Sequence, residues 1–134
     1  MDWKLEVVAI PVSDVDRAKT FYAEQVGFNV DLDTTVNDEI RLVQLTPPGS
    51  ACSIHLNAGM ADVSPGSLEG LLLVVSDVDA ARADLTKAGV EVSEIRHFED
   101  GVWIEGRGGD WNSFIFFKDP DGNSWTVQER PAPG

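Results

Sequence analysis

The chain has 134 residues, with 23 acidic against 10 basic side chains and a formal net charge of −13 at pH 7. Its length suits one ordinary domain with a single core. The acidic excess repels phosphate backbones and anionic lipids, so we expect neither nucleic acid nor a membrane as partner. The sequence lacks an apolar run near the roughly 20 residues that a membrane-spanning helix needs. Its first ten residues do not resemble a signal peptide, so a cytoplasmic location is the default expectation.

A repeat divides the sequence into two halves. The string V-S-D-V-D begins at Val12 and again at Val75, almost half the chain later. Each copy follows an apolar run and precedes a helical pattern that ends at a glycine, Gly27 or Gly89. A repeat of this length indicates two related structural modules.

The first half predicts a strand over residues 3–12 and a helix that runs from Asp14 to Gly27. Ser13 is the expected N-cap, and Asp16 places a negative charge near the positive helix end. Gly27 fits a left-handed C-terminal cap. Three further strands are expected over residues 28–35, 39–46 and 51–57. Apolar and polar residues alternate along these segments, and turn-forming residues separate them.

The second half repeats the pattern. A strand over residues 70–76 leads to Ser76 as the expected N-cap and to a helix that ends at Gly89. Strands follow over residues 91–96, 102–105, 113–118 and 124–129, the last of them after a D-P-D-G turn. We interpret the chain as one domain made of modules 1–57 and 69–130, each a βαβββ unit to which the second module adds one short strand, with residues 58–68 as the linker.

These motifs together resemble the glyoxalase/bleomycin-resistance (vicinal oxygen chelate) superfamily. The resemblance rests on the doubled unit, the strand that enters V-S-D-V-D, the Phe21-Tyr22 pair with Gly27-Phe28 after it, and D-P-D-G-N before the last strand. It implies an α+β fold in which two tandem βαβββ modules form a cup-shaped mixed sheet around a small-molecule site. It also implies a homodimer, in which modules could exchange between chains. Members include glyoxalase I, extradiol dioxygenases, epimerases and metal-free drug-sequestering proteins, so the fold leaves function open.

In metal-dependent members, the resemblance implies a divalent ion held by side chains from the opening and closing strands of each half. Those four positions fall here at Val7, His55, Gly70 and Thr126. One imidazole with a threonine does not supply the donors that zinc or harder ions require. Shifting to Glu6 or Glu69 would turn the side chain to the opposite strand face unless a bulge intervened. We therefore expect no metal cofactor.

Polar side chains remain at the strand positions that would face the cup. Ser53, His55 and Asn57 alternate on one strand, and Thr126 and Gln128 alternate on another. The resemblance favours a cavity lined by these residues, with Val7 and Gly70 adding apolar wall and open space. On the opposite, apolar face of the strand that carries Ser53, His55 and Asn57 lie Cys52, Ile54 and Leu56. We therefore expect Cys52 to be a buried, inert thiol.

Aromatic residues gather in the last third of the chain. Trp103 and Trp111 flank the glycine-rich loop 106–110, which could act as a lid, and their rings could stack on an aromatic ligand. Packing in the core or a dimer is the alternative, and it is at least equally favoured for Trp125 and the neighbouring phenylalanines. His97 is expected in a solvated loop.

The leading hypothesis is a metal-independent protein that binds a small hydrophobic or aromatic molecule for resistance or sequestration. The first alternative is an enzyme, namely a lyase, isomerase or dioxygenase that uses a metal through His55, or a catalyst with His55 as general base. The second alternative is a cup filled by its own side chains, in a protein that acts only through partners.

Overall fold

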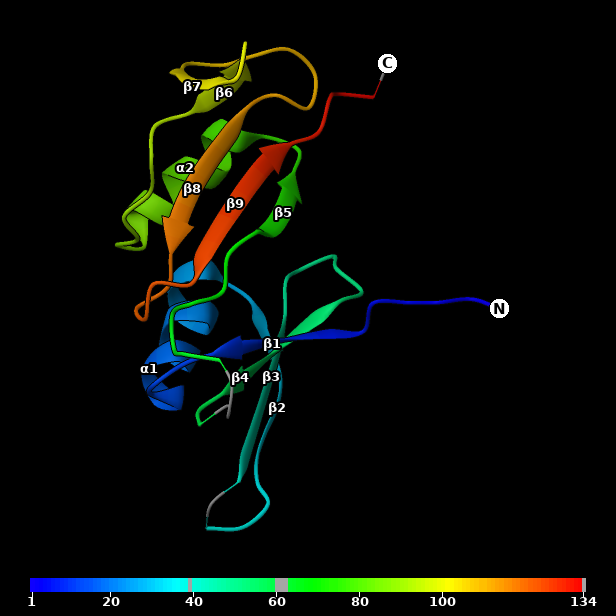
Figure 1. Cartoon of the computed structure of the whole chain (residues 1–134), viewed down its shortest axis with the longest axis vertical. Coiled ribbons are helices and arrows are strands. Elements are labelled where there is room, and N and C mark those ends of the chain that lie inside the picture. Colours follow the sequence, from blue (N-terminus) through cyan, green and yellow to red (C-terminus); the bar gives the residue numbers. More distant parts are fainter. Residues whose placement is uncertain (39, 60–62, 134) are drawn as a thin grey trace. The chain divides into compact units, whose positions relative to one another are not determined.

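The computed structural model describes residues 1–38, 40–59 and 63–133. The chain divides into two compact units (Figure 1): Met1–Leu68 with Asp119–Asn123, and Glu69–Lys118 with Ser124–Gly134. One mixed sheet of four strands and another of five, with few helices, confirm the predicted α+β fold. Residue 39 of the expected strand 39–46 and residues 60–62 of the expected linker lie outside the described residues.

The first unit contains the four-stranded sheet, in the order β1-β4-β3-β2. Its strands are β1 (Val7–Pro11), β2 (Asn29–Thr35), β3 (Arg41–Thr46) and β4 (Ser53–Asn57). β1 pairs with β4 in parallel, and the other neighbours are antiparallel. Cys52 lies just outside β4 and is half-buried, so the expected strand 51–57 starts two residues late and the thiol is less enclosed than predicted.

Helix α1 (Val15–Thr20) continues into a π-helical segment, η1 (Phe21–Val26), which ends at Gly27 with a φ of 91°. The predicted left-handed cap at Gly27 is therefore confirmed. The Gly27 amide donates to the carbonyl of Tyr22, five residues back, which is the spacing of a π-helix. Buried Val43, Leu45, Ile54 and Leu56 form the core of this unit together with Phe21 and Tyr22.

Both predicted N-caps are wrong by one residue. The caps are Asp14 and Asp77, whose side chains accept hydrogen bonds from the backbone amides of Arg17 and Ala80 at 3.1 and 3.0 Å. A carboxylate satisfies a free amide and also complements the positive end of the helix. Ser13 is engaged elsewhere, since its amide and hydroxyl both donate to the carboxylate of Asp121.

The predicted D-P-D-G turn is confirmed, and it packs within the first unit. The Gly122 amide donates to the carbonyl of Asp119 at 3.0 Å. The buried carboxylate of Asp119 accepts the hydroxyl of Tyr22 at 2.7 Å, and the Asn123 amide group donates to the carbonyl of Pro11 at 2.9 Å. These contacts join residues about one hundred positions apart in the sequence.

The second unit contains the five-stranded sheet, in the order β5-β9-β8-β6-β7. Its strands are β5 (Leu71–Val75), β6 (Arg96–Glu99), β7 (Val102–Glu105), β8 (Phe114–Lys118) and β9 (Ser124–Glu129). Helix α2 (Val78–Lys87) packs against β8 and β9 (Figure 1) and buries Val78 and Leu85. The core side of the sheet presents Ile115, Phe117, Trp125 and Val127.

The strand expected over residues 91–96 is misplaced. That segment makes only an isolated bridge between Val92 and Phe117, and the strand β6 begins at Arg96. β6 and β7 form a hairpin whose turn contains two residues with positive φ, Asp100 and Gly101. His97 consequently lies in a strand, mostly buried, and the prediction of a solvated loop is wrong. Among the described residues, no helix has the length and apolar character to cross a membrane.

Candidate functional site

Four aromatic rings meet on the face of the five-stranded sheet that points away from α2. Because side chains alternate along a strand, Phe114 and Phe116 lie opposite the buried Ile115 and Phe117. The Trp103 ring lies edge-on to both phenylalanines, with centroid distances of 5.1 Å. Its ring also lies 5.2 Å from that of Phe98. We call Phe98, Trp103, Phe114 and Phe116 the aromatic face.

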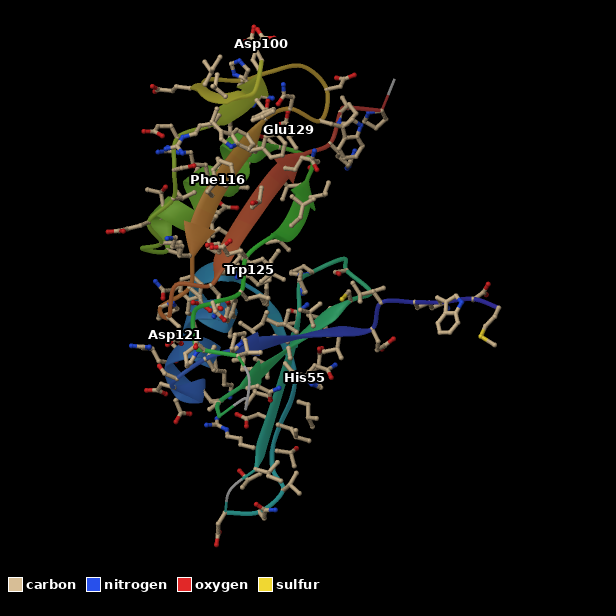
Figure 2. All side chains as sticks on the ribbon, in the orientation of Figure 1. His55, Asp100, Phe116, Asp121, Trp125 and Glu129 are labelled. Atoms are coloured by element: carbon tan, nitrogen blue, oxygen red, sulfur yellow. The ribbon has the colours of Figure 1, made fainter. Side chains whose placement is uncertain are left out.

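Much of the aromatic face is open to solvent. Phe98 and Trp103 are 48% and 47% exposed, a large apolar surface for two packed rings. The Arg96 guanidinium lies 5.9 Å from the centre of the Phe116 ring, within the range of a cation–π contact. Phe116 is labelled in Figure 2 on β8, on a different strand from Trp125. This face can therefore stack with a flat apolar molecule.

Polar and aliphatic side chains border the aromatic face along β9 and β5. Thr126 pairs with Phe116 and Gln128 with Phe114, so both share this face. On β5, Leu72 pairs with Thr126 and Val74 pairs with Gln128, and both aliphatic side chains are about half exposed. Two predicted site residues, Thr126 and Gln128, thus share a sheet face with the two phenylalanines that contact the predicted Trp103.

Trp111 and the loop 106–110 are linked to this border through the backbone. The Gln128 side chain donates to the Trp111 carbonyl at 2.8 Å. Trp111 has a φ of 61° and is 50% exposed, and its ring makes no aromatic contact within the described part of the chain. The structure thus places Trp111 near Gln128 but does not join it to the ring cluster.

The first unit carries a second, hydrogen-bonded surface that we call the polar face, formed by Asp31, Gln44, Thr46, Ser53 and His55. Ser53 and His55 alternate with the buried Ile54 and Leu56, as predicted. His55 Nε2 lies 2.9 Å from Gln44 Oε1, and the hydroxyls of Thr46 and Ser53 are 2.6 Å apart. The Thr46 hydroxyl also donates to Asp31.

The structure also locates the three other predicted residues, Val7, Asn57 and Gly70. Val7, on β1, pairs with Ser53 on β4 and adds an apolar neighbour to the polar face. Asn57 lines a cavity of about 300 Å³ with Val15, Ile40, Arg41, Leu42 and Ala58. Gly70 precedes β5 with a φ of 83°, and a Cβ there would have no atom within 4 Å, so open space adjoins its backbone. The role of all nine predicted residues in ligand binding stays a prediction.

The residues at the family's metal positions do not fit a divalent ion. Val7 and Gly70 offer no side-chain donor, and the polar face presents His55 beside an amide group. In residues 1–38, 40–59 and 63–133, no group of three or more His, Cys, Asp and Glu side chains could hold a metal. Zinc sites use three or four such ligands, and calcium needs several oxygens.

A cavity of about 440 Å³ lies in the second unit among charged side chains. Its two guanidinium groups are both engaged, because Arg107 pairs with Asp79 and Glu129 while Arg82 donates to the Ser93 carbonyl. The hydrogen bond to Glu129 raises the pKa of Arg107. This arrangement is a structural ion-pair cluster in which neither guanidinium is left free to attract an anion.

Sequence reasoning missed the partners that complete each face. Gln44 and Thr46 alternate with the buried Val43 and Leu45, so strand periodicity alone could have assigned them to the polar face. Arg96 was missed because its contact with the Phe116 ring depends on the pairing of β6 with β8, which periodicity does not reveal. Asp31 lies at a shift in the register between β2 and β3, which the sequence does not mark.

Comparisons with known proteins agree with this architecture. Residues 4–127 match the family model described as the Glyoxalase/Bleomycin resistance protein/Dioxygenase superfamily. The curated "Uncharacterized protein YetH" of Bacillus subtilis (strain 168) is 25% identical over 128 residues, which cover 94% of this chain and 98% of that protein.

Two solved structures from Streptomyces sp. CB03234 are similar over nearly their whole length. The antibiotic binding protein TnmS3 is 33% identical with a TM-score of 0.80, covering 96% of this chain and 97% of its own. A glyoxalase/bleomycin resistance protein is 34% identical with a TM-score of 0.76, covering 93% of this chain and 99% of its own.

Proposed function

Because this chain belongs to the glyoxalase/bleomycin resistance protein/dioxygenase superfamily, we propose that it binds a small hydrophobic or aromatic molecule on its aromatic face. The binding is independent of metal and serves resistance or sequestration. The protein works as a cytoplasmic homodimer. The carrying observation is the half-exposed Trp103 ring, held edge-on between two phenylalanines on the sheet face away from α2.

The shape of the aromatic face supports a flat ligand. Edge-on contacts with Phe114 and Phe116 hold the Trp103 ring on the sheet, so little side-chain entropy remains to be lost on binding. The polar side chains at its border, Thr126 and Gln128, offer hydrogen bonds that would orient the ligand. The likeness to TnmS3, an antibiotic binding protein at 33% identity, supports binding of a small organic molecule.

The enzyme alternative has less support. A general base needs a partner that orients it and stabilises its charge, commonly a carboxylate. His55 Nε2 instead meets the neutral amide oxygen of Gln44. A metal-based reaction would need donors that Val7 and Gly70 do not supply.

The first test measures binding of 2-methoxynaphthalene and of bleomycin by quenching of tryptophan fluorescence. We compare the wild type with Trp103→Ala and with the control Trp3→Ala, whose side chain is 87% exposed and lies ahead of β1. Loss of one stacking ring should weaken binding of a bound probe about tenfold, since such contacts contribute on the order of 1 kcal/mol beyond the buried area. The control should bind as the wild type does.

Two results would overturn the proposal. One is that neither probe binds, or that Trp103→Ala binds as tightly as the control. The other is one tightly held equivalent of Zn²⁺, Ni²⁺, Fe²⁺ or Mn²⁺ in elemental analysis, lost in His55→Ala, which would favour the metalloenzyme. Light scattering during gel filtration tests the homodimer, and a mass of one chain would contradict it.

A further inference from the structure

One carboxylate sets the direction of every hydrogen bond on the polar face. Asp31 only accepts, so the hydrogen of the Thr46 hydroxyl points to it. The Ser53 hydroxyl lies 2.6 Å from the Thr46 oxygen and must then be the donor of that pair. The Ser53 oxygen keeps a lone pair free to accept.

The orientation of the Gln44 amide follows from these directions. Its NH₂ group lies 3.4 Å from the Asp31 carboxylate and 3.4 Å from the Ser53 oxygen, and both atoms accept. The opposite orientation would place an amide oxygen against a carboxylate. The oxygen Oε1 of Gln44 therefore faces His55.

The Gln44 amide oxygen fixes the tautomer of His55. An amide oxygen only accepts, so the His55 nitrogen 2.9 Å away, Nε2, carries the hydrogen. In the uncharged ring, Nδ1 then holds a lone pair. Asp31, Gln44 and His55 thus form a directed chain across β2, β3 and β4, with an acceptor at its end.

The acceptor at the end of the chain is open. Nδ1 of His55 has no hydrogen-bond partner among the described side chains and backbone groups, whereas Nε2 has one. Every buried side-chain nitrogen or oxygen in the described residues does have a partner. Nδ1 is therefore not fully buried. Figure 2 labels His55 on its strand in the first unit.

We propose that His55 Nδ1 accepts a hydrogen bond from a hydroxyl or N–H group of a small molecule bound on the polar face of the first unit, and that Gln44 and Asp31 are positioning residues that hold the ring in this form. The proposal rests on the proposed function only in taking a small organic molecule as ligand. It selects a phenol, alcohol or amine at this point and disfavours a carbonyl or an anion, because two lone pairs would meet.

The test compares two probes that differ by one donor, 2-naphthol and 2-methoxynaphthalene, in titrations followed through the NMR resonances of the polar face, so that binding on this face is what is read. The wild type should bind 2-naphthol about five- to tenfold more tightly, the usual effect of one neutral hydrogen bond. His55→Phe should remove this preference and leave the affinity for the methoxy probe within about twofold, since a ring remains at the position.

Gln44→Met tests the positioning role, with Gln25→Met in η1 as the matched control. Gln44→Met should reduce the preference for 2-naphthol at least threefold, and Gln25→Met should keep it. The ¹⁵N spectrum of the His55 ring gives an independent readout. The wild-type ring should carry its hydrogen on Nε2, with slow solvent exchange, and exchange should become fast in Gln44→Met.

The outcomes separate this inference from the proposed function. If the wild type binds both probes equally, or if His55→Phe keeps the preference, the inference is wrong while small-molecule binding stands. If neither probe binds on the polar face, the inference is wrong, and the proposed function is judged by the Trp103→Ala test. A wild-type ring with its hydrogen on Nδ1 overturns the inference in every case.

Discussion

The imidazole of His97 and the carboxylate of Glu99 lie 3.0 Å apart at Nε2, while Nδ1 of the same ring lies 2.9 Å from the carbonyl oxygen of Gly106. Both neighbours only accept hydrogen bonds. Both ring nitrogens carry a hydrogen to donate only when the ring is protonated. The Gly106 carbonyl first and the Glu99 carboxylate second raise the pKa of His97 above its usual 6.5. The contact joins β6 to the start of the loop 106–110.

This relationship predicts a stability that falls as the pH rises. A raised folded pKa contributes stability that is complete below the unfolded value of about 6.5 and is lost as the pH passes through the folded value. We expect the free energy of unfolding in urea to decrease from pH 6 upward through the folded pKa of His97. In His97→Gln this decrease should be absent, and in Glu99→Gln it should be smaller.

Glu91→Gln provides the matched control, because Glu91 is exposed and lies outside β6. It should keep the pH dependence of the wild type. A His97→Gln variant whose stability still falls over the same pH range would show that another group is responsible.

The buried hydrogen bond between Tyr22 and Asp119 carries a second prediction. Tyr22→Phe keeps the ring, which stacks on Phe28 at 5.8 Å, and removes only the hydroxyl that lies 2.7 Å from the carboxylate. Because the substitution leaves a buried carboxylate without one of its donors, it should lower the free energy of unfolding by about 1–3 kcal/mol. Urea unfolding should show this loss. A double-mutant cycle with Asp119→Asn should give a favourable coupling free energy between the two side chains. Additive effects of the two substitutions would contradict a direct interaction.

Strand periodicity and the repeated V-S-D-V-D string predicted most of the fold, because burial on one sheet face imposes alternation. The features that the sequence did not reveal depend on contacts between segments. The π-helical turn before Gly27 is held by one amide bond to Tyr22, whose hydroxyl reaches Asp119 almost one hundred residues away. The β6–β7 hairpin depends on positive φ at Asp100, a conformation that aspartate adopts but does not signal.

The candidate sites follow the same division. His55 and Trp103 were identified from residue type and strand position, which the sequence contains. The hydrogen-bonded chain behind His55 was not identified, because the link from Gln44 to Asp31 crosses the register shift between Val30 and Leu32. A bulge changes which side chains meet across two strands, and its position is set by the pairing and not by local sequence.

Two glycines with nearly equal backbone angles give a third prediction. Gly66 and Gly59 have φ values of 80° and 78°, so both lie in the left-handed region where alanine is strained. A Cβ at Gly66 would lie 2.0 Å from the Asp121 carbonyl oxygen, whereas at Gly59 it would have no atom within 4 Å. Gly66→Ala should therefore lower the melting temperature clearly more than Gly59→Ala. Equal effects would indicate that Gly66 does not pack closely on the D-P-D-G turn.

The last prediction concerns Arg107, which ties the loop 106–110 to α2 and β9. Its guanidinium donates to Asp79 at 2.7 Å and to Glu129, and Glu129 also accepts the Val78 amide at 2.9 Å. The side chain of Arg107 is 46% exposed, so solvent screens these pairs, and Arg107→Met should cost less than about 1 kcal/mol of global stability. The local effect should be larger. The amide of Gly108, which donates to the Ser113 hydroxyl at 3.1 Å, should exchange with deuterium several times faster than in the wild type.

Arg130→Met is the control for Arg107→Met, because it removes the same charge from an exposed residue beyond β9. Exchange at Gly108 should be unchanged in this variant. Raising the salt concentration to about 1 M, where the screening length is near 3 Å, should bring the wild type toward the exchange rate of Arg107→Met. If Arg107→Met exchanges at the wild-type rate in low salt, the loop is held by the Gly108–Ser113 and His97–Gly106 hydrogen bonds and not by this ion pair.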